Sequence, residues 1–232
     1  MQGHLFHTLS IADGLGVNKP VPLKKDIFGL LDGSDRTLEV WSTTPMALLE
    51  VRIIPDPVLR APTQKVETFD KKLHAFLDDM YETMVAEHGM GLAAPQVGRS
   101  EQIAIVDLSI EGVPTPTITS LSGKEPSSHI HKERLEIINP KLTAGGPSVS
   151  SQEGCLSIPD YRDTIKRHET VIITAHDRHG NEFQVAAEEL AAFCIQHEMD
   201  HLEGILFVDH LSRLKKQLFR RWCTKNGFEF AE

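Results

Sequence analysis

The segment CIQHEMDHLEG, from Cys194 to Gly204, constrains the fold of this chain more than any other. His197 and His201 are four residues apart, so on a helix both imidazoles lie on one face, about one turn from each other. Two imidazoles in that arrangement can bind one metal ion, and Glu198 beside them can accept a proton from a bound water. The segment therefore predicts a metal-binding helix in a hydrolase. A helix that contains two histidines by chance is the alternative.

A catalytic metal site needs a third protein ligand next to an open position. Cys155 is the strongest candidate, because it lies in the apolar, strand-like stretch EGCLSIP. A buried structural cysteine is the alternative interpretation. A zinc peptidase would carry its third ligand downstream of the helix, where His210 and Glu203 are available but lie outside the expected motif.

A third segment, GMGLAAPQVG, spans residues 89–98. Its first two glycines permit a close backbone approach that a Cβ atom would prevent. Gln96 offers a side-chain amide that can donate to a developing oxyanion. A glycine-rich turn after a helix is the alternative. A phosphate-binding loop fits poorly, because no strand leads into the segment and the Lys and Ser/Thr partners are missing.

The apolar pattern predicts helices mixed with antiparallel strands, which is an α+β class. Apolar residues at spacings of three and four predict one helix from Phe69 to Gly89 and another from about Ala187 to Leu202. Residues 111–133 are rich in Pro, Ser, Thr and Gly and predict an inserted surface loop, in which His129 and His131 occur by chance. Strands are expected at 103–108, at 134–140 and on both sides of a turn within 169–187, and a basic amphipathic helix at about 210–224.

Composition sets the broad class. A formal charge of -9 over 232 residues argues against DNA as a partner, and the sequence holds no run of 18 apolar residues that would cross a membrane. Three cysteines are too few for a disulfide framework, which favours reduced thiols. Residues 1–45 lack the pattern of a signal or transit peptide. We expect them to be a non-catalytic extension of a catalytic domain at 46–232.

Together, the three segments resemble the motifs of the peptide deformylase family. The motifs GxGLAAPQ, EGCLS and HExDH stand at 89–96, 153–157 and 197–201 without a mismatch at any defined position. The resemblance covers most of residues 46–222 and is closest to the type found in Gram-negative bacteria and some organelles. It implies an α+β fold in which antiparallel β-sheets pack around a central metal-binding helix, followed by a C-terminal helix.

The resemblance also implies a reaction, the removal of the formyl group from the N-terminal formyl-methionine of nascent polypeptides. Cys155, His197 and His201 would bind Fe(II) in the cell, with Ni, Co or Zn as possible replacements. Metal-bound water would attack the formyl carbon, with Glu198 as general base and then general acid. The oxyanion would be stabilised by the metal, the Gln96 side chain and the Leu156 backbone N–H.

Further expectations concern the substrate and its surroundings. An extended peptide would pair with the backbone of Met90, Gly91 and Gly154 like an added strand. Arg162 would meet the peptide backbone or its far carboxylate, unless it is simply a solvated arginine. Side chains of the central helix would line the methionine pocket, namely Leu190, Phe193 and Cys194.

The C-terminal helix suggests a partner. Its basic residues would bind the ribosome surface near the exit tunnel, where rRNA is anionic. From this role together with the reduced thiols, we expect a bacterial cytoplasm as the location, with an organelle matrix as the alternative. Two alternatives remain open: a non-catalytic homologue that binds nascent chains or ribosomes, and a zincin-type metallopeptidase. The basic residues expected to contribute are Arg213, Lys216, Arg220 and Arg221.

Overall fold

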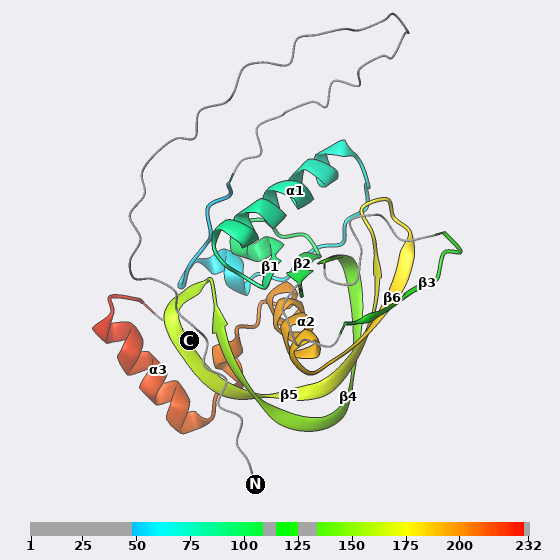
Figure 1. The fold of residues 1–232 in the computed structure, drawn as a ribbon. Coiled ribbons are helices and arrows are strands. Elements are labelled where there is room, and N and C mark those ends of the chain that lie inside the picture. The colour runs from blue at the N-terminus through cyan, green and yellow to red at the C-terminus, as the bar shows by residue number, and fades with distance from the viewer. Residues whose placement is uncertain (1–47, 109–114, 125–133, 230–232) are drawn as a thin grey trace, which may run out of the picture. The chain divides into compact units, whose positions relative to one another are not determined.

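The computed structural model of the protein describes residues 48–108, 115–124 and 134–229 (Figure 1). The chain divides into two units, Met1–Ser42 and Thr43–Glu232, and all of the described residues belong to the second. The extension expected at 1–45 and the pair His129 and His131 lie outside the described residues. Among the helices of the described ranges, none is both long and apolar enough to cross a membrane.

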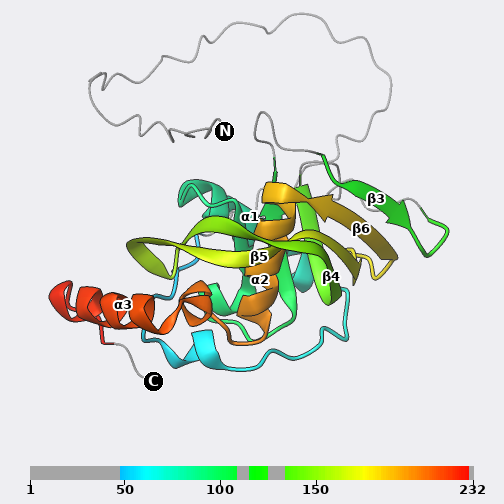
Figure 2. The ribbon, with the colours of Figure 1, turned by 90° about the horizontal axis from the view of Figure 1, so that it is seen from below.

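Within the described ranges, six strands form one antiparallel sheet in the order β1-β2-β4-β5-β6-β3. The two longest strands, β4 and β5, curve together past the central helix α2 in both views of the ribbon (Figures 1 and 2). This confirms the predicted α+β class with a helix at the centre of antiparallel strands. The strands are β1 (Gly91–Ala93), β2 (Ile103–Asp107), β3 (Thr117–Ser120), β4 (Arg134–Cys155), β5 (Ile158–His176) and β6 (Glu182–Glu188).

Two strand predictions need correction. The strand expected at 134–140 continues to Cys155, because register shifts absorb the residues that do not fit a regular ladder. One shift lies between Gly145 and Ser148, where Gly146 has a φ of 70° that other residues rarely adopt. The insert at 111–133 is not entirely loop, since β3 pairs with β6 and places Ile118 opposite Val185.

The part of the chain that the structure describes also contains the α-helices α1 (Lys71–Ala86), α2 (Glu189–Leu202) and α3 (Arg213–Lys225). Asp70 caps α1, since its side chain accepts from the backbone N–H groups of Lys72 and Leu73 at 2.9 and 3.0 Å. The predicted apolar stripe of α1 is buried as expected, from Leu73 through Met84. Three short 3-10 helices are η1 (Pro57–Arg60), η2 (Ala94–Val97) and η3 (Phe207–His210).

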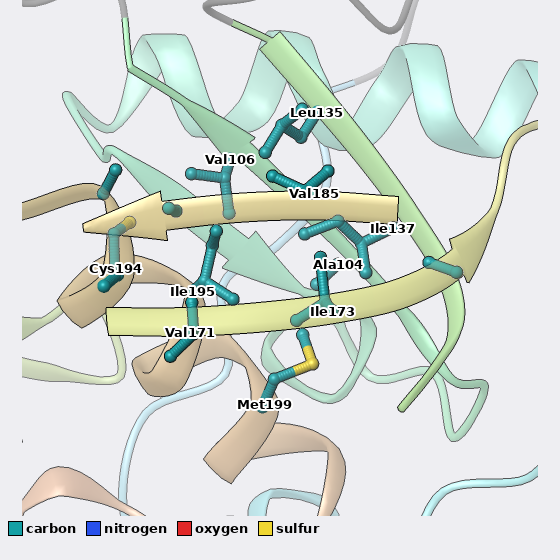
Figure 3. Packing of buried hydrophobic residues seen from close by; sticks show 14 of the residues in the cluster. Ala104, Val106, Leu135, Ile137, Val171, Ile173, Val185, Cys194, Ile195 and Met199 are labelled. Atoms are coloured by element: carbon teal, nitrogen blue, oxygen red, sulfur yellow. The ribbon is translucent and has the colours of Figure 1, made fainter. Parts of the chain in front are cut away.

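The central helix presents different faces to the core and to the candidate site. Ile195 and Met199 are buried and point into the sheet (Figure 3). A fully buried side chain of this kind contributes about 1.5–3 kcal/mol to stability. His197 and His201 have the same i, i+4 spacing on another face of the helix. The packing of Ile195 and Met199 against the sheet therefore also fixes the positions of the two histidines. The sheet residues in this core cluster include Ala104, Val106, Leu135, Ile137, Val171, Ile173 and Val185.

The chain leaves α2 through Gly204, as the sequence predicts. Its φ is 72°, and a Cβ atom at this position would lie 2.6 Å from the carbonyl oxygen of Arg60. Glycine is therefore required both for the backbone conformation and for the close approach of the last residue of η1.

The C-terminal helix begins later than predicted, at Arg213 instead of about 210. Ser212 caps it by accepting from the N–H of Lys215, and His210 belongs to the preceding η3. The helix packs through Phe219 and Cys223, both 1% exposed. Lys215 also donates to the Asp163 carboxylate at 2.7 Å, which joins α3 to β5.

Candidate active site

Three candidate metal ligands meet where β4 ends beside α2. The ligand atoms of Cys155, His197 and His201 all lie within 4.8 Å of one another, and the Cys155 Sγ is 3.2 Å from the His201 Nε2. Burial lowers the pKa of His201 well below its usual value, which favours the neutral imidazole that binds metals. One thiolate and two imidazoles form a donor set suited to late first-row divalent metals. The geometry of the described residues therefore fits the metal site that the sequence predicts.

Glu153 orients the first of these histidines. Its Oε2 lies 2.9 Å from the His197 Nδ1, which leaves the other ring nitrogen for a metal. Arg167 donates to both carboxylate oxygens of Glu153, at 2.9 and 3.0 Å. Burial opposes the charged form of Glu153, but the hydrogen bonds from His197 and Arg167 outweigh it and lower the pKa of this carboxyl to about 2. Glu153 is therefore ionised throughout the physiological range.

Arg167 also connects β5 to the metal-binding helix. Its Nη1 donates to the Asp200 Oδ2 at 2.6 Å, and the same oxygen lies 2.7 Å from the His210 Nε2. The guanidinium group is almost fully buried, with 4% of the side chain exposed. A buried arginine that holds two carboxylates fixes the helix against β4 and β5 more firmly than surface ion pairs could.

Glu198 is the candidate general base. Its side chain is 3% exposed, and its Oε2 has no hydrogen-bond partner among the described residues. Burial raises the pKa of Glu198 to about 7. Such a carboxyl can both accept and release a proton near neutral pH. A Cβ atom at Gly91 would lie 2.7 Å from the Glu198 carboxyl carbon, so the missing side chain there makes room for this group.

The amide of Gln96 has a defined orientation. The backbone N–H of Ala93 donates to its Oε1 at 2.8 Å, so the NH2 group faces the opposite way. Its Nε2 lies 3.5 Å from the Cys155 Sγ and 3.3 Å from the Ser157 Oγ. Gln96 is 2% exposed. The arrangement places a buried donor beside the metal ligands, as expected for an oxyanion-stabilising group.

The residues predicted to contact substrate lie in three places. Met90 is 38% exposed and directly precedes β1. Gly154 pairs with the exposed Arg162 across β4 and β5, one residue before Cys155. Leu156 follows Cys155 in the turn to β5, and its side chain packs against the core under α1.

The predicted pocket residues all lie on the first turns of α2. Leu190 and Phe193 are partly buried, and Phe193 packs against the main core cluster. Cys194 is 8% exposed and belongs to that cluster. Burial raises the pKa of the Cys194 thiol well above its usual value, so this cysteine remains protonated.

Sequence reasoning missed the residues that support the ligands. Glu153 stands inside the EGCLS motif, and its place two residues before Cys155 could have drawn attention to it. Asp200 stands likewise inside the HExDH motif. Ser157 closes the EGCLS motif and carries the same signal as Glu153. Arg167 gave no such signal, because an arginine in a polar strand is common.

Comparison with known proteins assigns the family. A family model described as polypeptide deformylase matches residues 48–217. The chain belongs to this family. It is thus a hydrolase of the deformylase type, and the resemblance inferred from the three motifs is confirmed.

Curated deformylases cover most of the chain. The peptide deformylase of Helicobacter hepaticus is 42% identical over 180 residues, which is 78% of this chain and 92% of that protein. Peptide deformylase 1 of Shewanella oneidensis is 43% identical over 187 residues, 81% of this chain and 100% of that protein. Among solved structures, a peptide deformylase from Legionella pneumophila is 37% identical with a TM-score of 0.66, covering 78% of this chain and 96% of that one.

Proposed function

We propose that the protein removes the formyl group from the N-terminal formyl-methionine of nascent polypeptides. The observation that carries this proposal is the position of two buried groups around the Cys–His–His cluster. One is Glu198, whose pKa is raised to about 7, and the other is the NH2 group of Gln96. A proton acceptor and an oxyanion donor beside a metal site are the groups that amide hydrolysis needs.

Cys155, His197 and His201 would hold the metal, which we propose is Fe(II) in the cell, with Ni, Co or Zn able to replace it. When bound, such an ion acts as a Lewis acid and lowers the pKa of a coordinated water. Glu153 and Arg167 keep His197 turned so that one ring nitrogen is free for the metal.

Glu198 would handle the proton. Its carboxylate accepts the proton of the attacking water and then delivers it to the leaving amine nitrogen. Because burial raises its pKa to about 7, Glu198 can be either ionised or protonated near neutral pH, as a group that first accepts and then releases a proton must be. Gly91 allows the carboxyl group to reach this position.

Gln96 would stabilise the negative charge that develops on the formyl oxygen. Its NH2 group is already oriented by the Ala93 N–H, so little reorganisation is needed during the reaction. We propose the Leu156 backbone N–H as a second donor, since this residue directly follows Cys155. Loss of one such donor typically raises the barrier by about 3–4 kcal/mol.

The substrate would bind as an added strand against Met90 and Gly91 on one side and Gly154 on the other. Gly91 opens β1, which pairs with β2 and stands at one end of the strand order in the described sheet. Arg162, exposed opposite Gly154, could meet the peptide backbone or its far carboxylate. The methionine side chain would contact the residues of the first turns of α2, Leu190, Phe193 and Cys194.

The decisive experiment measures formate release from formyl-Met-Ala-Ser by protein loaded with Fe(II) or Ni(II) without oxygen. We expect turnover that is lost in Glu198→Ala and retained in Glu203→Ala, a matched change at an exposed glutamate that follows α2. Folded protein that gives no formate with any of the metals would support the non-catalytic alternative. Cleavage of unformylated peptides would support a metallopeptidase.

We also propose that α3 binds the ribosome near the exit tunnel and that the protein lies in the bacterial cytoplasm. Arg213 and Arg221 are exposed on this helix, whereas Lys215 is engaged by Asp163. Charge reversal at Arg213, Lys216, Arg220 and Arg221 should abolish salt-sensitive cosedimentation with ribosomes. Reversal of Lys71 and Lys72, which are exposed on α1, serves as the control, and unchanged binding in the α3 variant would refute the proposal.

The catalytic domain is proposed to begin at Met46. A chain that starts there keeps every described residue and should therefore fold and release formate at the full-length rate. Loss of folding or activity would show that residues 1–45 contribute to the enzyme.

A further inference from the structure

The segment that enters the domain, residues 49–54, contacts η2, which carries Gln96, and the turn after Cys155, which carries Leu156. The Arg52 N–H donates to the carbonyl oxygen of Gln96 at 2.7 Å. Two residues later, the Ile54 N–H donates to the carbonyl oxygen of Ser157 at 3.0 Å. The segment therefore connects the backbone of the oxyanion donor to the turn that follows Cys155.

Side-chain contacts also join η2 to the turn after Cys155. The Gln96 Nε2 lies 3.3 Å from the Ser157 Oγ and 3.5 Å from the Cys155 Sγ. Gln96 and Ser157 are 2% and 0% exposed. Buried carbonyl groups need donors, because an unsatisfied one costs about 1–3 kcal/mol. The entering segment supplies those donors to both residues.

The 3-10 helix η2 explains why Gln96 needs this donor. At the end of η2, the Gly98 N–H donates to the Pro95 carbonyl, and the Arg99 N–H donates to the Ala94 carbonyl. The Gln96 carbonyl comes after these two acceptors in the sequence and accepts from the Arg52 N–H. A short 3-10 helix is intrinsically weak, so an external bond at its last turn fixes the orientation of the residue.

The entering segment is itself held in place. The Leu49 N–H donates to the Thr83 Oγ1 at 2.9 Å, and Ile54 is buried with 4% exposure. The Arg52 side chain, by contrast, is 40% exposed and pairs with the exposed Glu50. What Arg52 contributes to the site is therefore its backbone N–H.

We propose that the backbone N–H of Arg52 positions Gln96 for oxyanion stabilisation, and that the Ile54 N–H holds the adjoining Ser157 turn in register with it. This inference rests on the role of Gln96 in the proposed function. Arg52 touches no reacting atom, so it acts as a positioning residue through the backbone of Gln96. Small displacements of a preorganised donor can reduce rate by up to about a hundredfold.

The test compares two substitutions at one position. Arg52→Ala keeps the N–H and should leave kcat within about twofold of the parent. Arg52→Pro removes the N–H and should lower kcat by roughly tenfold to a hundredfold. KM and the affinity for Ni(II) should change little in both variants, because the cluster of ligands is not altered. Equal kcat for folded Arg52→Pro and Arg52→Ala would overturn the inference.

A double-mutant cycle separates positioning from general damage. In a Gln96→Ala background, Arg52→Pro should have no further effect on kcat, because the group that it positions is absent. Independent, additive losses would overturn the inference. If Gln96→Ala alone leaves kcat unchanged, the proposed role of Gln96 fails, and that outcome is distinct from a failure at Arg52.

A second variant avoids the conformational restriction of proline. Replacing the amide N–H of residue 52 with an ester oxygen, by incorporation of the α-hydroxy analogue of arginine, removes the donor and otherwise only weakens the Val51 carbonyl as an acceptor. This variant keeps the side chain and should lower kcat in the same way as Arg52→Pro. Full activity in the folded ester variant would refute the inference even if Arg52→Pro fails to fold.

Discussion

Gly91 lies so close to Glu198 that a Cβ atom added to the glycine would stand 2.7 Å from the carboxyl carbon. The contact joins the first strand of the sheet to the metal-binding helix. It also defines the position of the buried Glu198 carboxyl group, whose pKa is raised to about 7. The glycine in this motif therefore has a steric role in addition to any contact with substrate.

Gly91→Ala should lower kcat by on the order of a hundredfold, because the added methyl group displaces the Glu198 carboxylate from its proton-transfer position. Formate release and Ni(II) affinity should be measured together, since only the first is expected to change strongly. Gly145→Ala is the control, because its Cβ would meet only the Thr170 hydroxyl, at 3.0 Å. Wild-type kcat in folded Gly91→Ala would contradict the steric role.

Glu153→Gln should weaken metal binding by roughly tenfold to a hundredfold, because His197 loses its ionised partner. Competition with a chelator measures this affinity directly and does not depend on turnover. Glu136→Gln provides a matched control, since Glu136 is also buried and paired with an arginine, Arg178, but lies at the opposite end of β4 from Cys155. Similar metal affinities in the two variants would argue against an orienting role for Glu153.

The attachment of α3 should depend on pH through Asp163. Burial raises the pKa of this carboxyl, but its hydrogen bonds with Lys215, the Thr164 N–H and Tyr161 outweigh that effect, and the pKa is lowered overall. A lowered folded-state pKa gives stability that is present above the unfolded pKa and lost as the pH falls through the folded value.

Asp163→Asn should therefore lower the free energy of unfolding by on the order of 1 kcal/mol at pH 7. The difference from the parent should shrink as the pH falls below about 4. Thermal unfolding across this range measures the effect. A difference that stays constant down to the acid transition would exclude the ion pair as its source.

Gly204→Ala should destabilise the protein by about 1–3 kcal/mol or more, because it combines a positive φ with a clash against the Arg60 carbonyl. Gly227→Ala separates the two causes. Gly227 has a φ of 77° but no atom within 4 Å of its Cβ position. Urea unfolding should show the larger loss for Gly204→Ala, and equal losses would mean that the backbone relaxes around the clash.

The ligands could be predicted from the sequence because their signals are local. His197 and His201 lie four residues apart on one helix, and Cys155 stands in a short motif of its own. The α1 and α2 helices were also predictable, since their apolar residues repeat with the period of a helix.

The support around the ligands was not predictable, because it depends on contacts between distant residues. Arg167 reaches Glu153 across 14 positions and Asp200 across 33, and no local pattern marks such pairs. β3 was missed for a similar reason: four residues form a strand only because β6 lies beside them. β4 was predicted too short because its irregular register hides the alternation of a strand.

The candidate ligands and the charged residues that orient them come from β4, β5 and α2, and only β6 lies between β5 and α2 in the sequence. Gln96 and Gly91 come from an earlier part of the chain and join through the pairing of β2 with β4. Closing the short connections between successive strands costs less chain entropy than bringing the two parts together. The strands and the helix that carry the metal ligands can therefore assemble from short connections. Catalytic activity also requires the long-range pairing of β2 with β4, which brings Gln96 beside the ligands.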